Sequence, residues 1–289
     1  MSSQTVERPV EPDELPEGPD GQRPRRRIWR NLLIVAAVLV GLLVVLVAWF
    51  LLARDRAEQL TQDDALEDFR AATSADTSAD GRPAPGVYPG AASGSESIGL
   101  PGFDEELGPN APVTVTYGES GCYTYRADFN SHHWRSWTFC PTDTATFALV
   151  ELQSWTARKA PALDVETLST YSCAVPLDFL WDGMAPGETR SSECTGTLDT
   201  DDSVTGDVGT VEVVGTETVT IDGTVVEGVR IRTSDEFSEA QTGFERGDWL
   251  LHPDNGLPLS VGIEAELAGG PTTYTENFQL DLGSLTPAT

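Results

Sequence analysis

Hydrophobic and polar residues alternate along most of the chain from residue 112 onward. The clearest run is LPLSVGIEAEL, residues 257–267, in which the odd positions are Leu, Val, Ile or Ala and the even positions are Pro, Ser, Gly or Glu. Successive side chains of a strand point to opposite faces, so this period of two predicts strands with one buried and one hydrated face. Such strands are typical of antiparallel sheets. We therefore expect a mainly β domain, α+β at most, over residues 112–289.

Turn signals separate the alternating runs. Asp-Gly at residues 222–223 and Asn-Gly at 255–256 each lie between two runs, which predicts two-residue β-hairpins. Residues 122–130 and 133–140 predict a further hairpin with a tight turn between them. Within this part of the chain, only residues 161–171 (PALDVETLSTY) favour a short helix.

An uninterrupted apolar run precedes the β pattern. Residues 32–53 read LLIVAAVLVGLLVVLVAWFLLA, without a charge or a proline. A helix of this length rises about 33 Å, and the hydrocarbon core of a bilayer is about 30 Å thick. The run is too long for the apolar part of a signal peptide, and no cleavage motif follows it. We therefore expect a transmembrane helix at residues 28–53, in contact with the lipid bilayer.

The arginines predict the orientation of this helix. Five of them crowd into the eight positions from Arg23 to Arg30, whereas only Arg54 and Arg56 follow the apolar run closely. The positive-inside rule then places residues 1–31 in the cytoplasm and residues 54–289 outside. We expect a single-pass protein of the cell membrane with an extracellular C-terminal domain.

Three further segments lack the β pattern. Residues 1–27 are rich in Pro, Glu, Asp and Gly, which predicts a disordered cytoplasmic tail. Residues 54–72 carry apolar residues at helical spacing, which predicts that the membrane helix continues as a short stalk. Residues 73–111 are rich in Ser, Gly, Ala and Pro, which predicts an irregular linker.

All four cysteines follow the apolar run. An even number in a domain outside the cytoplasm predicts two disulfides. Four cysteines allow three pairings, and we favour Cys122–Cys140 and Cys173–Cys194 because each closes a short loop. The first of these would join the open end of the hairpin whose turn lies near Asn130.

The net charge of −28, with 46 acidic and 18 basic residues, limits the partners of the chain. Nucleic-acid binding requires a positive surface, so we expect no nucleic-acid partner. An acidic surface favours cationic partners such as Ca²⁺ or Mg²⁺.

Two polar clusters invite a metal-site interpretation. His132 and His133 are adjacent, but neighbouring strand residues point to opposite faces, so we expect a polar hairpin tip. Residues 199–207 (DTDDSVTGD) contain four aspartates without the EF-hand pattern, which predicts a solvated acidic loop. We therefore expect no metal and no cofactor.

The chain lacks the common catalytic motifs. It contains no G-x-S-x-G, H-E-x-x-H or Walker sequence, and cysteines in disulfides supply no thiol nucleophile. Pairs of carboxylates are too abundant here to single one out. We therefore expect a protein that is not an enzyme.

Residues 248–264 (DWLLHPDNGLPLSVGIE) carry a resemblance to a known family. The strand with Trp249, the Gly-Leu-Pro turn and the return strand resemble those of LolA/LppX-like envelope carriers, and residues 213–232 are similar to the preceding hairpin. The likeness covers residues 208–282 and implies a curved half-barrel with helices on its concave side, carrying lipids or lipoproteins. Two disulfides and a membrane helix depart from that family. The whole chain resembles single-span surface proteins of actinobacteria, with Lys159 as its one lysine.

These patterns together favour an extracytoplasmic binding domain on a membrane helix. The ligand would be hydrophobic, or the partner another envelope protein, bound in a sheet-lined groove. A sensor or assembly factor and a cell-wall hydrolase are the alternatives. The groove or core positions that we expect are Trp249, Leu251, Leu257, Leu259, Val261 and Ile263.

Overall fold

The structure is a computed structural model that describes residues 23–53, 55–72, 81–100, 103–160, 163–200, 203–270 and 272–289. The chain forms two compact units, Met1–Leu52 and Ala53–Thr289. The first contains helix α1 (Arg23–Ala53), whose stretch Trp29–Phe50 is long and apolar enough to cross a membrane. The predicted disordered tail lies mostly outside the described residues.

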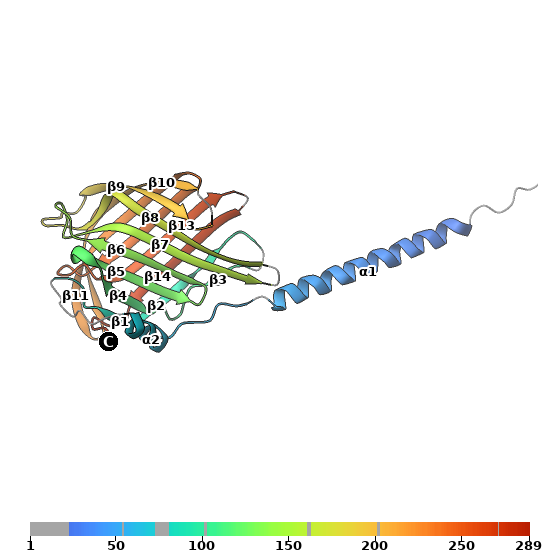
Figure 1. Ribbon diagram of the computed structural model, residues 1–289, viewed down its shortest axis with the longest axis horizontal. Coiled ribbons are helices and arrows are strands. Elements are labelled where there is room, and N and C mark those ends of the chain that lie inside the picture. Colours follow the sequence, from blue (N-terminus) through green and yellow to red (C-terminus); the bar gives the residue numbers. More distant parts are fainter. Residues whose placement is uncertain are drawn as a thin grey trace, which may run out of the picture. The chain divides into compact units, whose positions relative to one another are not determined.

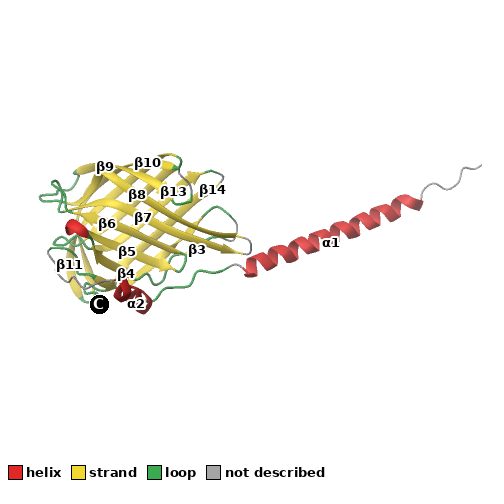
Figure 2. Ribbon diagram, in the orientation of Figure 1, coloured by secondary structure: helices red, strands yellow, loops and turns green. Residues whose placement is uncertain are grey.

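The second unit is a β domain built on one antiparallel sheet (Figure 1, Figure 2). Over the described part of the chain, fourteen strands follow the order β1-β4-β5-β6-β7-β8-β9-β10-β11-β12-β13-β14-β2-β3. The predicted mainly β fold, a curved antiparallel half-barrel sheet on one apolar helix, is confirmed. The strands are β1 (Gly86–Tyr88), β2 (Gly90–Ser97), β3 (Glu105–Glu106), β4 (Val113–Tyr117), β5 (Tyr123–Asn130), β6 (His133–Cys140), β7 (Phe147–Ala160), β8 (Leu163–Leu180), β9 (Thr189–Leu198), β10 (Val204–Ile221), β11 (Thr224–Glu239), β12 (Thr242–Leu251), β13 (Pro258–Gly269) and β14 (Thr272–Leu282).

The curvature brings the two ends of the strand order together. β1 pairs with β4 and β2 pairs with β14, yet only Pro89 separates β1 from β2 in the chain. The segment after β3 also returns along β2, with the amides of Leu107 and Ala111 each donating over 3.0 Å to carbonyls of β2. Residues 86–97 therefore connect both ends of the sheet.

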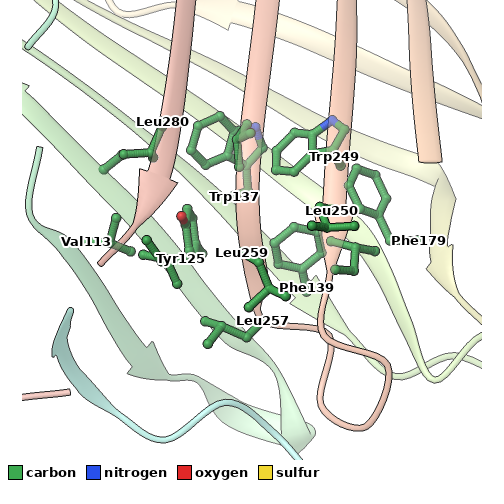
Figure 3. Packing of buried hydrophobic residues seen from close by; sticks show 14 of the residues in the cluster. Val113, Tyr125, Trp137, Phe139, Phe179, Trp249, Leu250, Leu257, Leu259 and Leu280 are labelled. Atoms are coloured by element: carbon green, nitrogen blue, oxygen red, sulfur yellow. The ribbon is translucent and has the colours of Figure 1, made fainter. Parts of the chain in front are cut away.

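Inward-pointing aromatic and aliphatic side chains fill one end of the curved sheet (Figure 3). The Trp249 ring lies edge-on to Trp137 and Phe179, with centroids 5.3 and 5.1 Å apart. Burial of each such side chain contributes about 1.5–3 kcal/mol to stability. The six predicted groove or core positions all belong to this buried core: Trp249, Leu251, Leu257, Leu259, Val261 and Ile263.

The predicted helical stalk at residues 54–72 is helical only in its second part. Residues 55–61 are not helical, and α2 (Gln62–Ala72) is a separate helix. Thr61 caps it, because the Asp64 amide donates to Thr61 Oγ1 while Asp64 Oδ2 accepts from the Thr61 amide. This reciprocal cap starts a new helix instead of continuing α1.

Helix α2 packs against β1 and β4. It faces Thr114 and Thr116, which alternate along β4 with the buried core residues Val113 and Val115. The helix therefore covers the convex face of the sheet, whereas the LolA/LppX-like resemblance implies helices on the concave face.

Two other segment predictions need correction. The predicted linker at 73–111 contains strands β1, β2 and β3, although residues 73–80 and 101–102 lie outside the described residues. Residues 163–171 of the short helix predicted at 161–171 form the first half of strand β8, and residues 161–162 lie outside the described residues. Pairing with β7 supplies the backbone partners of that segment, and such tertiary context overrides a weak helical preference.

One of the two predicted tight hairpins is confirmed. Ile221 pairs directly with Thr224, and Asp222 and Gly223 both have positive φ, as in a type I′ turn. The second turn is longer than predicted, because residues 252–257 form a six-residue connection between β12 and β13. The His252 amide donates to the Leu257 carbonyl over 2.9 Å and closes that loop.

Both predicted disulfides are present, in the pairing that the loop lengths favour. Cys122–Cys140 joins the open end of the β5–β6 hairpin, and Cys173–Cys194 links β8 to β9. Disulfides of this kind indicate an oxidising compartment.

Candidate functional site

A cavity of about 180 Å³ opens inside the curved sheet, at the end where β9 finishes and β14 begins. Its lining comes from inward-pointing side chains of β6, β7, β8 and β11 to β14, together with Ile98 and Leu198. Strands that are far apart in the sequence therefore build it together.

The lining has distinct chemical parts. β7 and β8 contribute four hydroxyls in register, with Ser154 opposite Ser169 and Thr156 opposite Thr167. Phe237, Leu267, Leu152, Leu198 and Ile98 supply apolar surface. The cavity therefore suits a ligand with both an apolar and a hydrogen-bonding part.

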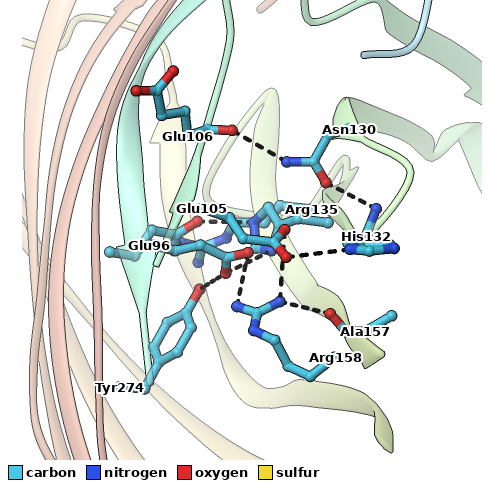
Figure 4. Close-up of polar contacts among 11 residues, drawn as sticks. Glu96, Glu105, Glu106, Asn130, His132, Arg135, Ala157, Arg158 and Tyr274 are labelled. Atoms are coloured by element: carbon cyan, nitrogen blue, oxygen red, sulfur yellow. Dashed lines mark hydrogen bonds and ion pairs between the residues drawn. The ribbon is translucent and has the colours of Figure 1, made fainter. Parts of the chain in front are cut away.

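A buried ionic network borders the cavity (Figure 4). The Arg135 guanidinium donates to Glu276 and to Glu245, each over 2.7 Å. Glu276 also pairs with His133, with 2.9 Å between Nε2 and Oε1. Arg135, Glu245 and Glu276 all line the cavity, so the network holds its charged surface in place.

The network continues through Glu96. This carboxylate lies 3.2 Å from His133 Nδ1 and 2.9 Å from Arg158, and it accepts a hydrogen bond from the Tyr274 hydroxyl over 3.1 Å. Burial alone would raise the pKa of Glu96, but His133 and Arg158 outweigh it and lower the pKa to about 2.

His133 is a cation at neutral pH. Burial alone would lower its pKa, but Glu96 and Glu276 outweigh burial and raise the pKa to about 9. Each ring nitrogen faces one of these carboxylates, so both are engaged.

The polar tip predicted at the two histidines needs correction. The turn lies where expected, at residues 131–132, but both imidazoles are buried. His132 faces Glu105 at 3.2 Å and Asp55 at 3.5 Å. Among the described residues, no three His, Cys, Asp or Glu side chains are grouped so that they could hold a metal ion.

A second, smaller cavity of about 30 Å³ lies beside three carboxyl groups, those of Asp207, Asp235 and Glu245. That volume has room for about two water molecules. Asp207 belongs to strand β10 and is 6% exposed, which corrects its placement in a solvated acidic loop. Ser192, Thr233 and Trp249 also line this small cavity.

Two of these carboxyls are hard to ionise. Burial, and then the charge of Glu245, raise the pKa of Asp207 to about 7. Burial, followed by Glu245 and Asp207, raises the pKa of Asp235 to about 8. A buried carboxylate needs a cationic partner or a proton.

The convex face carries a larger hollow. It has a volume of about 600 Å³ and lies over β10 to β14. Arg232 and Arg246 line it together with Glu212, Asp248 and Glu264. This hollow lies on the outside of the sheet and is more open than the internal cavity.

Comparisons of the chain with protein-family models, with curated protein sequences and with solved structures found no match.

Proposed function

We propose that the protein is a single-pass membrane protein whose extracytoplasmic β domain binds a small ligand, without chemical conversion, in its internal cavity. The observation that carries this function is the 180 Å³ cavity lined by hydroxyl, apolar and charged side chains. The apolar helix and the two disulfides support a membrane-anchored domain in an oxidising compartment.

The dimensions of the cavity restrict the ligand. Typical sites for drug-sized ligands measure about 300–1,000 Å³, so this cavity suits a smaller molecule. The apolar core beside it is filled by Trp137, Trp249 and Phe179. A long acyl chain therefore has little room inside, which narrows the hydrophobic ligand expected from the sequence to a small amphipathic one.

The hydrolase alternative has weaker support. Asp207 and Asp235, whose pKa values are raised to about 7 and about 8, line the cavity of 30 Å³, which is too small for a sugar ring. His133 has no free ring nitrogen to serve as a base. These features favour binding over catalysis.

Native mass spectrometry of the full-length protein in detergent tests the proposal. We expect a small molecule to copurify with the wild type and to be absent from Ser169→Trp, which fills the cavity. Thr210→Trp, which adds the same side chain beside the convex hollow, should retain it. Retention of the molecule by Ser169→Trp, in protein with intact disulfides and normal circular dichroism, would contradict internal binding.

Docking of an envelope protein is the second candidate, as expected for a sensor or assembly factor. The convex hollow favours it, because Arg232 and Arg246 offer guanidinium groups on a chain of charge −28. A photocrosslinker at Arg246 should then trap one specific protein in intact cells. The same crosslinker at Val225, on a hairpin away from the hollow, is the control.

A further inference from the structure

The ionic network beside the internal cavity has more carboxyls than cations. His133, Arg135 and Arg158 pair with Glu96, Glu245 and Glu276. Within the described ranges, Asp207 and Asp235 form no ion pair, and Asp207 Oδ1 is buried without a hydrogen-bond partner. Each of these two carboxyls therefore needs either a proton or a cationic partner that the described residues do not supply.

Glu245 connects this unbalanced region to the cavity. It lines both the cavity of 180 Å³ and the small cavity that Asp207 and Asp235 line. Tyr171 and Phe237 line both cavities as well, with their rings 5.4 Å apart and edge-on. Carboxylates beside aromatic rings are the surroundings that an organic cation prefers.

We propose that the ligand of the internal cavity is a small organic amine, whose ammonium group lies against Glu245 on the side of Asp207 and whose apolar part lies against Leu198 and Leu267. This rests on the proposed function, since it assumes that the cavity is a binding site. The ammonium supplies the positive charge that the carboxyls lack, and the hydroxyls of β7 and β8 accept its remaining hydrogen bonds.

An anionic ligand fits the same surroundings poorly. Arg135 is the guanidinium that lines the cavity, and it already donates to both Glu245 and Glu276. An anion there would face Glu245 without a free cation, and like charges in a buried site repel strongly. The chain charge of −28 also attracts cations and repels anions during approach.

A bare metal ion is also a poorer fit than an ammonium group. Hard cations in proteins take six or more oxygen ligands at short distance. The described carboxyls are not grouped closely enough to coordinate one. An ammonium group needs only hydrogen-bond acceptors around it, which this arrangement supplies.

Three probes that differ chiefly in charge test the proposal on the full-length protein in detergent. Phenethylamine carries an ammonium group, phenylethanol is neutral and phenylacetate is an anion. By isothermal titration calorimetry at neutral pH, we expect phenethylamine to bind about tenfold or more tightly than phenylethanol, and phenylacetate not to bind.

Two variants locate the charge. Asp207→Asn removes a carboxyl without touching Arg135, and it should weaken amine binding about tenfold while leaving phenylethanol binding unchanged. Glu245→Gln removes the carboxyl that faces the ligand, and it should weaken binding of the amine about tenfold more than binding of phenylethanol. Glu236→Gln is the matched control, because Glu236 follows Asp235 on β11 and is exposed. It should bind the amine as the wild type does.

The outcomes separate the two proposals. Equal affinity for amine and alcohol, or unchanged amine binding in both variants, would overturn the cationic ligand. The organic amine would also be overturned if Ca²⁺ alone bound to the wild type and Glu245→Gln abolished that binding. If a neutral or anionic molecule copurifies and Ser169→Trp removes it, the amine proposal fails while the binding function stands. If no molecule copurifies and no probe binds, both fail.

Discussion

His133 Nε2 lies 2.9 Å from Glu276 Oε1, and neither side chain reaches solvent. The two residues come from β6 and β14, strands that are far apart in the sequence. Their contact joins the β5–β6 hairpin to β14, so the ion pair is part of what holds the curved sheet together.

Replacement of His133 tests this role. His133→Ala leaves Glu96 and Glu276 buried with less compensating charge, so we expect the free energy of unfolding to fall by about 3–5 kcal/mol. Urea unfolding followed by tryptophan fluorescence measures it. His252→Ala, in the β12–β13 loop, should change stability by less than about 1 kcal/mol. A His133 variant as stable as this control would show that the pair contributes little.

The β domain should lose stability as the pH rises from about 4 to about 9. The folded-state pKa values of Asp207 and Asp235 are raised from 3.8 to about 7 and about 8, and that of His133 from 6.5 to about 9. A group whose pKa is higher in the folded state than in the unfolded state contributes fully to stability at a pH below its unfolded-state pKa. This contribution is lost as the pH rises through its folded-state pKa. All three groups therefore act in the same direction. We expect Tm to fall from about pH 4, where Asp207 and Asp235 begin to ionise in the unfolded chain, to about pH 9.

Glu96 adds a loss on the acid side. Its pKa is lowered from 4.5 to about 2, so its contribution is present above 4.5 and is lost as the pH falls toward 2. Differential scanning fluorimetry from about pH 2 to pH 9 should find the maximal Tm between the acid loss due to Glu96 and the loss at higher pH due to Asp207, Asp235 and His133. Asp207→Asn should flatten the curve between about pH 4 and pH 7, because it removes one of the titrating groups. A wild-type Tm that climbs steadily to pH 9 would contradict the raised pKa values of Asp207, Asp235 and His133.

The disulfide between β5 and β6 should stabilise the domain mainly by restricting the unfolded chain. The two cysteines are separated by 18 positions, and a loop of about that length predicts about 3 kcal/mol of stabilisation. We expect Cys122→Ser with Cys140→Ser to lower the free energy of unfolding by about this amount. Peptide mapping of the wild type without reductant should recover Cys122 joined to Cys140 and Cys173 joined to Cys194. Recovery of Cys122 joined to Cys173 or to Cys194 would count against independent closure of the β5–β6 hairpin.

The orientation in the membrane is open to a direct measurement. The arginines before the apolar run predict that everything after it lies outside the cytoplasm. Alkaline phosphatase, which is active only outside the cytoplasm, should be active when it is fused after Thr289. Green fluorescent protein at the same position should stay dark when the fusion is exported unfolded. The opposite pair of results would reverse the predicted topology.

Local features of the sequence predicted much of the fold. The period of two along residues 257–267 gave strand β13 with Leu259, Val261, Ile263 and Ala265 on the buried face. The Asp-Gly turn and both disulfides also depend on residues that are close in the chain. Helix α2 could have been found too, since Thr61 and Asp64 have the spacing of a reciprocal N-terminal cap.

The candidate site was harder to predict, because its partners come from distant strands. A signal was nevertheless present in β6, where His133 and Arg135 alternate in phase with the buried Trp137 and Phe139. Charged residues in the phase of the core are expected only where buried counter-charges meet them. The sequence pattern can reveal that such charges exist. Only the curvature of the folded sheet, which brings β6 and β14 together, shows that Glu276 is the partner of His133.

The connection through Pro89 sets a condition on biogenesis. β2 lies in the first third of the chain, whereas its partner β14 is the last strand to be synthesised. On the topology that we propose, β2 is exported long before β14 can pair with it, and the sheet closes only after translocation is complete. During that interval the edge of β2 is exposed to other chains, so this is the stage at which an envelope chaperone would protect the protein most.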